Sequence, residues 1–260
     1  TLSICTGCSP GGRDTVIYTP DESFSGFDIF TYVLEGGDGE AGSGTVTVEV
    51  VELRIPDLAV VAPGVATDYY VVAEIEYLPD FDALTPYASD VVSSINFSST
   101  GGDFAGSGRA DLVGAVFTGY IDAPVDGIYE LSIESDDGSR LLVGDRVVVN
   151  NDGLHAMVEK TGSIGLKAGL HEVRVEFFEL FGGAGMIVRW TPPGMTKSVI
   201  PPGAWFRPGT PDLTGDGVVD GADLGALLAQ WGMSGSADLD ASGVVDGADL
   251  GLLLSAWTSS

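Results

Sequence analysis

The sequence predicts a mainly β protein built around an antiparallel β-sandwich. Between Phe117 and Trp190, apolar residues alternate with polar ones, as they do in strands that bury one face. The 260 residues include 38 glycines and 13 prolines, a composition that favours many short strands joined by turns. The apolar positions expected in the sandwich are Ile128, Leu131, Ile133, Leu141, Val143, Val147, Val149, Leu170, Val173, Val175 and Phe177.

Acidic residues outnumber basic ones by 38 to 11, so the chain carries a formal charge of −27. A charge of this sign repels phosphate backbones and anionic membranes, and it favours cations. The longest apolar runs, such as residues 58–65, are far too short to cross a membrane. We therefore expect no nucleic-acid partner and no membrane span.

The two cysteines, Cys5 and Cys8, form a single CTGC motif near the N-terminus. One pair cannot complete a four-ligand zinc site, and the strand-to-helix setting of a redox enzyme is missing. A local disulfide in an exported protein is the simpler interpretation, and two free thiols are the alternative. The chain begins at Thr1 rather than Met, which suggests a processed chain or a piece of a longer one.

Residues 1–52 form the first predicted segment, with strands near residues 15–19, 29–35 and 44–51. The segment resembles the second half of a cadherin-like, immunoglobulin-type repeat of bacterial surface proteins. The residues that carry this resemblance are Tyr18-Thr19-Pro20, Phe24, Gly26, Asp28, Phe30, Tyr32 and Thr45 to Val48. A full sandwich of this class needs about seven strands, so the segment either lacks its first strands or completes its sheet against another element. Its acidic residues would line solvated turns or ligate calcium.

Residues 53–66 carry Pro56 and Pro63 without clear alternation, so we expect a linker or an edge strand there. The first strand of the sandwich should follow within residues 68–81, with Tyr70, Val72 and Ile75 as candidate core positions. Residues 93–108 are polar and rich in glycine, which predicts a long loop containing one short strand.

The central segment, residues 67–207, resembles a PA14 domain, which implies an antiparallel sandwich. Many residues in order and spacing carry the resemblance: Phe117-Thr118-Gly119, Pro124, Gly127-Ile128-Tyr129, Ser135-Asp136-Asp137-Gly138, Asn150, Gly153, His155, Ala168-Gly169, His171, Phe178-Glu179 and Trp190. In sugar-binding members of the family, the yeast flocculins and related adhesins, a matching Asp pair holds a calcium ion that bridges to sugar hydroxyls.

The pair Asp136 and Asp137 is therefore the first candidate site for metal and ligand. Two adjacent carboxylates repel each other unless a cation or several donors lie between them. The resemblance implies that a second loop, residues 179–185, completes the site, with backbone carbonyls as its ligands. The alternative is that both carboxylates accept hydrogen bonds from turn amides and from Arg140.

A second polar cluster, Asn150, Asn151, Asp152 and His155, follows the next predicted strands, and we include Asn150 and Asn151 among the candidate ligand-binding residues. His155 and His171 are expected to be packed, hydrogen-bonded residues. The sequence contains no nucleophile elbow with a Ser-His-Asp order, no HExxH and no phosphate-binding glycine loop. We expect a protein that is not an enzyme.

After a short linker, residues 208–211, the tail of residues 212–260 contains an internal repeat with a period of 26 residues, from Asp212 to Asp238. Each copy places oxygen ligands at the positions of a calcium loop, with Gly217 or Gly243 at the sharp turn. The predicted metal ligands are Asp212, Thr214, Asp216, the carbonyl of Val218, Asp220 and Asp223 in the first copy, and Asp238, Asp240, Ser242, the carbonyl of Val244, Asp246 and Asp249 in the second.

Each loop leads into a short predicted helix. The apolar residues expected on the inner faces are Leu224, Leu227, Leu228 and Trp231, then Leu250, Leu253, Leu254 and Trp257. The duplicated unit resembles a dockerin, and the acidic tail contains no Lys or Arg, so we expect Ca²⁺ binding to be coupled to its folding. The resemblance implies a cohesin-like or self partner, contacted through Gly221-Ala222 and Gly247-Ala248, and similar tails occur on surface proteins of planctomycete-type bacteria.

Two function classes follow for a secreted or cell-surface bacterial protein. The first is a carbohydrate-binding or adhesive module that binds glycan or a neighbouring surface protein and is anchored by its calcium-loaded tail. The second is a structural subunit of a surface filament or array, a homo-oligomer in which a neighbouring chain completes the N-terminal sandwich.

Overall fold

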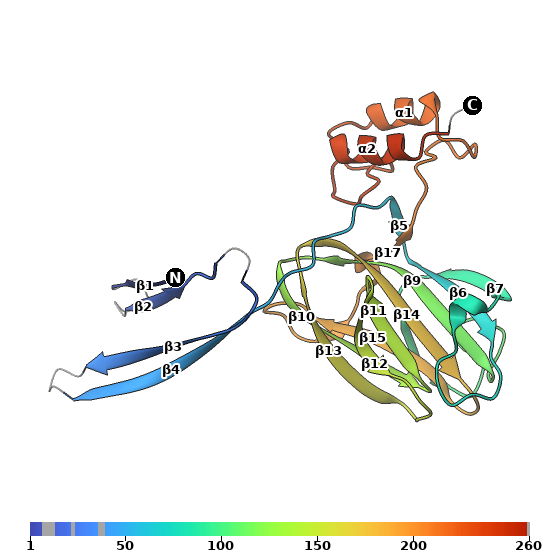
Figure 1. The fold of residues 1–260 in the computed structure, drawn as a ribbon. Coiled ribbons are helices and arrows are strands. Elements are labelled where there is room, and N and C mark those ends of the chain that lie inside the picture. Colours follow the sequence, from blue (N-terminus) through green and yellow to red (C-terminus); the bar gives the residue numbers. More distant parts are fainter. Residues whose placement is uncertain (7–13, 22–23, 36–39, 259–260) are drawn as a thin grey trace. The chain divides into compact units, whose positions relative to one another are not determined.

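The structure is a computed structural model that describes residues 1–6, 14–21, 24–35 and 40–258. The chain divides into two compact units, Thr1–Glu52 and Leu53–Ser260. Neither helix of the described residues is long or apolar enough to cross a membrane. Figure 1 shows both units, with most of their elements labelled.

The first unit consists of two separate antiparallel two-stranded sheets, β1 (Leu2–Cys5) with β2 (Thr15–Tyr18) and β3 (Gly26–Glu35) with β4 (Ala41–Val50). The sequence predicted the last three strands and missed β1, which has only four residues. Tyr18 stacks on Phe30 with ring centroids 6.3 Å apart, but no described residue of this unit is buried. Cys5 is disulfide-bonded, whereas Cys8, its expected partner, lies outside the described residues.

The second unit contains a sandwich of two antiparallel sheets. The larger has eight strands in the order β12-β11-β14-β9-β17-β5, with β6 beside β9 and β7 beside β6. The smaller has five, in the order β13-β10-β15-β16, with β8 beside β15. The strands of the larger sheet are β5 (Val61–Pro63), β6 (Val65–Val71), β7 (Ala88–Val92), β9 (Val113–Ala123), β11 (Ser139–Val143), β12 (Arg146–Asn151), β14 (Gly169–Glu179) and β17 (Trp205–Pro208). Those of the smaller are β8 (Asn96–Thr100), β10 (Gly127–Asp136), β13 (Val158–Leu166), β15 (Ala184–Thr191) and β16 (Ser198–Val199).

The core lies between these sheets, and most of the expected apolar positions are in it. Leu131, Ile133, Leu141, Val143, Val149, Val173, Val175 and Phe177 are all buried in it. Leu170 is also buried, but on the other face of β14, so its assignment to this core was wrong. Ile128 and Val147 are exposed, so their assignment to the core was wrong. In β10 the inward residues are Tyr129, Leu131 and Ile133, which places Ile128 on the outer face. A bulge between Leu141 and Leu142 interrupts the β11–β12 pairing and turns Val147 outward.

A smaller cluster covers the outer face of the larger sheet. Tyr70, Val72, Phe81 and Val116 are buried there, and Ile75 is partly buried against them. Tyr70, Val72 and Ile75, which we had expected in the sandwich core, therefore belong to this separate cluster. Phe81 lies on Gly114, where an added Cβ would meet its ring at 2.6 Å, so a glycine is needed at that point of β9.

The range expected to be a linker, residues 53–66, contributes structure to the sandwich. Arg54 bridges to Leu166, β5 pairs with β17, and Val65 is buried in the core. The alternative of an edge strand is thus the better description, because β5 lies at the end of the larger sheet and pairs there with β17. His171 is fully buried, as expected, and its Nε2 donates to the carbonyl of Lys167 at 2.7 Å.

The tail contains two short helices, α1 (Gly221–Leu228) and α2 (Gly247–Ser255), each starting in a capping box. Leu227 and Leu253 are fully buried, and Val219 and Val245 of the preceding loops join them in a small core. Leu228, Trp231, Leu254 and Trp257 are exposed, so their assignment to the inner faces was wrong. Both tryptophans lie beyond the ends of the helices, and the buried stripe on each helix is narrower than four positions.

The assigned core makes a testable prediction. Phe177→Ala removes a fully buried ring that stacks on Phe104 with centroids 4.3 Å apart, and it should lower the free energy of unfolding by about 3–5 kcal/mol. Phe27→Ala, whose side chain is 68% exposed, should change it by less than about 0.5 kcal/mol. Urea denaturation followed by tryptophan fluorescence measures both, and equal losses would contradict the core assignment.

Candidate functional site

Three carboxylates meet where the chain passes from one sheet of the sandwich to the other. Asp136 is the last residue of β10 in the smaller sheet, and Ser139 begins β11 in the larger. Glu179 ends β14, the neighbour of β11. This crossing brings one carboxylate oxygen from each of Asp136, Asp137 and Glu179 within 4.8 Å of the others. The peptide bond between Asp136 and Asp137 is cis.

Two backbone amides hold the carboxylate of Asp137 in place. The amide of His155 donates to Oδ1 at 3.0 Å, and the amide of Leu180 donates to Oδ2 at 3.1 Å. Arg140, the expected alternative partner, instead donates from Nε to Glu176 at 2.9 Å on the outer face of the larger sheet. The hydrogen-bonding alternative is therefore wrong for Arg140 and for the amides of the turn itself. Among the described residues, only Asp137 of the pair accepts from amides, and these belong to two distant loops.

Glu179 is the most deeply buried of the three carboxylates. Its side chain is fully buried, and neither carboxylate oxygen makes a hydrogen bond of good geometry, although the carboxyl group and the amide of Asp137 lie close enough to affect its pKa. Burial, together with the charges of Asp137 and Asp136, raises the pKa of Glu179 to about 8. Burial and the charge of Asp137 also raise the pKa of Asp136. An unpartnered buried carboxylate is costly, and a cation among the three would satisfy it, so this cluster could hold a metal ion.

The sequence analysis missed Glu179 as a site residue, because it expected backbone carbonyls from residues 179–185. A signal was present in the strand pattern. Phe177 faces the core, and side chains two residues apart in a strand share a face, so Glu179 must point inward as well. A carboxyl group that points inward in a strand of apolar residues needs a proton, a hydrogen-bond donor or a cation to compensate its charge. The adjacent Asp pair adds negative charge that a shared cation would balance.

Small residues and two loops border the three carboxylates. A Cβ on Gly183 would lie 2.6 Å from Oγ of Ser99 and 3.1 Å from Oδ2 of Asp136, so the loop just before β15 approaches β8 closely beside the pair. Oγ of Ser99 donates weakly to Asp136 at 3.5 Å. Phe181 and Leu154, next to the two residues whose amides hold Asp137, are both exposed. The rim of the site is thus partly apolar.

The predicted ligands Asn150 and Asn151 make local contacts. Asn151 is buried, and its Nδ2 donates to Oγ of Ser135 and to the carbonyl of Val158, both at 3.0 Å. Asn150 is exposed, and its Oδ1 accepts from the amide of Asp152 at 3.1 Å. Because neighbouring strand residues face opposite ways, the two cannot serve one site together. The two ring nitrogens of His155 lie 2.9 Å from the carbonyls of Ala156 and Asn151, and the tautomer of the ring decides which carbonyl accepts from it.

The second acidic group lies in the tail, in the second copy of the repeat. Asp238, Asp240 and Asp249 bring one oxygen each within 4.8 Å of one another. Oδ1 of Asp238 is buried without a partner, and burial raises the pKa of Asp238. Asp249 is fully buried and accepts from the amides of Leu239 at 2.6 Å and Asp246 at 2.7 Å. This group could also hold a metal ion.

In the first copy, the acidic side chains are occupied by backbone amides. Asp212 accepts from Gly215 and Gly217, both at 2.7 Å, and Asp223 accepts from Leu213 and Asp220, both at 2.8 Å. Thr214 takes the position of Asp240, and its hydroxyl donates to Asp212 at 3.3 Å.

The other predicted ligands of the two loops also have local partners. The carboxylates of Asp220 and Asp246 cap α1 and α2, where they accept from Ala222 and Ala248. Asp216 accepts from the amide of Val218, and Ser242 donates to the carbonyl of Val244.

Comparisons with known proteins find solved structures similar to part of this chain. The PA14 domain of the antifreeze protein MpAFP has a TM-score of 0.50 and 18% identity, over 61% of this chain and 97% of that one. A PA14 sugar-binding domain from an RTX adhesin has a TM-score of 0.50 and 18% identity, over 57% and 99%. An anti-sigma factor domain-containing protein has a TM-score of 0.49 and 19% identity, over 57% of this chain and 48% of that chain, so the chain spans about half of its length.

At these identities the similarity of the structures concerns the fold. The search of curated proteins finds no match to this chain. The family comparison matches residues 62–204 to the PA14 domain, more than half of the sequence. The chain therefore belongs to the PA14 domain family.

Proposed function

We propose that this protein is a non-catalytic module of a secreted or cell-surface bacterial protein, and that it binds carbohydrate through a calcium ion held by Asp136, Asp137 and Glu179. The observation that carries the proposal is the fully buried carboxylate of Glu179, which has no hydrogen-bond partner and lies beside two further carboxylates. The sugar-binding PA14 domain of the RTX adhesin, which shares the fold, supports the choice of ligand.

The chemistry of the three residues favours calcium. All the side-chain donors are carboxylate oxygens, the ligands that hard cations prefer, and Ca²⁺ accepts the irregular geometry of a turn and a strand end better than Mg²⁺ does. When bound, the ion would supply positive charge that attracts vicinal hydroxyl oxygens of a saccharide. The chain's own residues orient the ligands: the amides of His155 and Leu180 fix Asp137, and the strand register directs Glu179 inward.

The proposal assigns no catalytic role to the carboxylates. Retaining and inverting glycosidases separate their two carboxyl groups by about 5 to 9.5 Å so that a sugar bond or a water fits between them. Here one carboxylate oxygen from each of the three residues lies within 4.8 Å of the other two, and a shared cation would occupy these oxygens.

For the tail we propose a dockerin-like, calcium-stabilised anchoring or assembly domain. The buried, unpartnered oxygen of Asp238 supports a cation in the second loop. The exposed side chains of Leu228, Trp231, Leu254 and Trp257 repeat with the same period as the loops, and they offer an apolar surface for a cohesin-like or self partner.

One observation favours the second function class, a subunit of a surface assembly. No described residue of the N-terminal unit is buried, and Phe27, Ile29 and Val33 expose most of their surface on one face of β3. Isolated two-stranded sheets are marginally stable in water. A neighbouring chain that covers this face would complete the unit.

The first prediction tests sugar binding. Asp136→Asn removes one charge from the site and breaks only the weak contact with Ser99, so the sandwich should stay folded while glycan affinity falls by more than about tenfold. Asp145→Asn, in the exposed turn between β11 and β12, is the matched control and should bind as the parent does. A glycan array read with calcium and with chelator measures both. Unchanged binding by Asp136→Asn would exclude this site as the sugar site.

A second prediction uses the raised pKa of Glu179. Its folded pKa of about 8 lies above the ordinary value of 4.5, so the metal-free protein should lose stability as the pH rises from about 4.5 to about 8. Glu179→Gln should abolish this loss and raise the Tm of the metal-free protein at pH 8, while weakening the stabilisation by calcium. Glu172→Gln, exposed on the same strand, is the control. A Tm of the metal-free Glu179→Gln protein below that of the parent would contradict the unpartnered carboxylate.

The third prediction separates the two function classes. Residues 53–260 form a compact unit of their own, so deletion of residues 1–52 should leave the sandwich and tail folded. If a neighbouring chain covers the N-terminal sheets, the deletion also abolishes self-association measured by light scattering. Association that persists in the shortened protein would contradict the assembly hypothesis, and it would not affect the sugar-binding proposal.

A further inference from the structure

The segment of residues 53–62, here called the strap, is fastened to the sandwich at its first end. The guanidinium of Arg54 donates to both carboxylate oxygens of Asp57, at 2.8 and 2.9 Å, and to Nδ1 of His171 at 2.8 Å. Asp57 in turn accepts from the amide of Glu172 at 2.8 Å. These contacts tie the strap to β14, because His171 and Glu172 both belong to that strand.

The tail holds the other end of the strap. Val60 packs against the tail's own hydrophobic core. The amide of Val61 donates to the carbonyl of Leu239 at 2.8 Å, and the amide of Gly209 donates to the carbonyl of Val60 at 2.7 Å. The strap therefore supplies one apolar side chain and two backbone hydrogen bonds to the joint between the sandwich and the tail.

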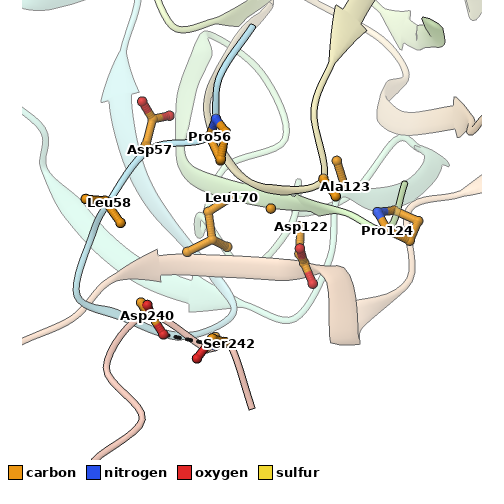
Figure 2. A pocket seen from close by; sticks show the side chains of 12 residues that line it. Pro56, Asp57, Leu58, Asp122, Ala123, Pro124, Leu170, Asp240 and Ser242 are labelled. Atoms are coloured by element: carbon orange, nitrogen blue, oxygen red, sulfur yellow. Dashed lines mark hydrogen bonds between the residues drawn. The ribbon is translucent and has the colours of Figure 1, made fainter. Parts of the chain in front are cut away.

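Figure 2 shows this joint from close by. The strap runs past Pro56 and Leu58 toward the tail loop that carries Asp240 and Ser242, and the turn with Ala123 and Pro124 faces them. A cavity of about 410 Å³ separates the three segments. Residues of the strap, the sandwich and the second loop all line this cavity, so the strap connects the loop with the sandwich alongside the linker of residues 208–211.

The peptide groups of Leu239 link the strap to the acidic group of the second loop. Leu239 stands between Asp238 and Asp240, and its amide donates to Oδ1 of Asp249 at 2.6 Å. Its carbonyl accepts from Val61. One residue is therefore bound on one side to a member of the candidate metal group and on the other side to the strap.

We infer that cation binding in the second loop stabilises the hydrogen bond between Leu239 and the strap, and thereby holds the tail in a fixed position on the sandwich. The first loop has no such role. This inference rests on the proposed calcium binding of the tail. Without a cation, Asp238, Asp240 and Asp249 repel one another, and the loop opens more easily. Opening removes the acceptor of Val61 and loosens the adjoining pairing of β5 with β17.

The repeat supplies its own comparison. Leu213 occupies the position of Leu239 in the first loop, and its amide is held by Asp223 at 2.8 Å in the same way. Its carbonyl accepts no backbone hydrogen bond from the strap within the described part of the chain. Equivalent substitutions in the two loops should therefore have different effects on the strap.

Hydrogen exchange of the intact chain, followed by mass spectrometry with calcium and with EDTA, tests the inference. Removing calcium should speed exchange in peptides covering residues 59–63 and Gly209 by on the order of tenfold. With calcium present, Asp238→Asn should reproduce this effect, and Asp212→Asn, at the same position of the first loop, should not. Calorimetric titration of both variants shows which loops still bind calcium.

Each outcome decides between the claims. If the parent binds no calcium in the second loop, the proposed role of the tail fails together with the inference. If the loop binds calcium but exchange of the strap is unchanged by EDTA, the inference fails and the proposed function stands. Equal acceleration by Asp238→Asn and Asp212→Asn would also overturn it, because this role would then not be specific to the second loop. Val60→Ala, which leaves both loops intact, should accelerate exchange even with calcium.

Discussion

The desolvation of carboxylates without positive partners is the constraint on which the rest of the structure depends. Glu179 and Asp137 are both buried where the chain crosses between the sheets, and a charged side chain in that position is unfavourable unless a counterion or several donors compensate it. Asp137 accepts two amide hydrogen bonds of good geometry, whereas Glu179 accepts none of that quality and keeps a raised pKa. The sandwich supplies a rigid frame that holds them together, since β10, β11 and β14 all end or begin at the crossing.

The same constraint operates in the tail, but with a different solution in each loop. In the first loop, backbone amides donate to Asp212 and Asp223. In the second loop, one oxygen of Asp238 is buried without a partner. Asp240 stands where the first loop has Thr214, and Ser242 stands where it has Asp216, so each loop carries four ligand aspartates. Within the described residues, only the second loop brings three of its carboxylates within 4.8 Å of one another. Two loops with nearly the same sequence thus differ in how strongly they require a cation. The second loop, which requires it more strongly, is the one that contacts the strap.

The sandwich could be predicted because its signals are local. Alternation from Leu131 to Phe177 reports which face of a strand is buried, and the turns are marked by Gly, Asp and Asn. Ile128 was misplaced because a pattern reports the periodicity of a strand better than its phase, and Val147 because a bulge cannot be read from the sequence. The adjacent pair Asp136 and Asp137 was recognisable in itself, but the role of Glu179 depends on the register of β14 with β11, a long-range property. The connection between Val61 and Leu239 joins residues far apart in the chain, and no local pattern indicates it.

The central claim is that Asp136, Asp137 and Glu179 together hold a calcium ion. A crystal structure of the protein grown with calcium, with the ion identified by its anomalous scattering, tests this claim most directly. The account predicts an ion whose ligands include a carboxylate oxygen from each of the three residues, at the 2.3–2.6 Å typical of calcium. An ion bound elsewhere, or a Glu179 side chain that stays outside the coordination sphere at saturating calcium, would contradict it.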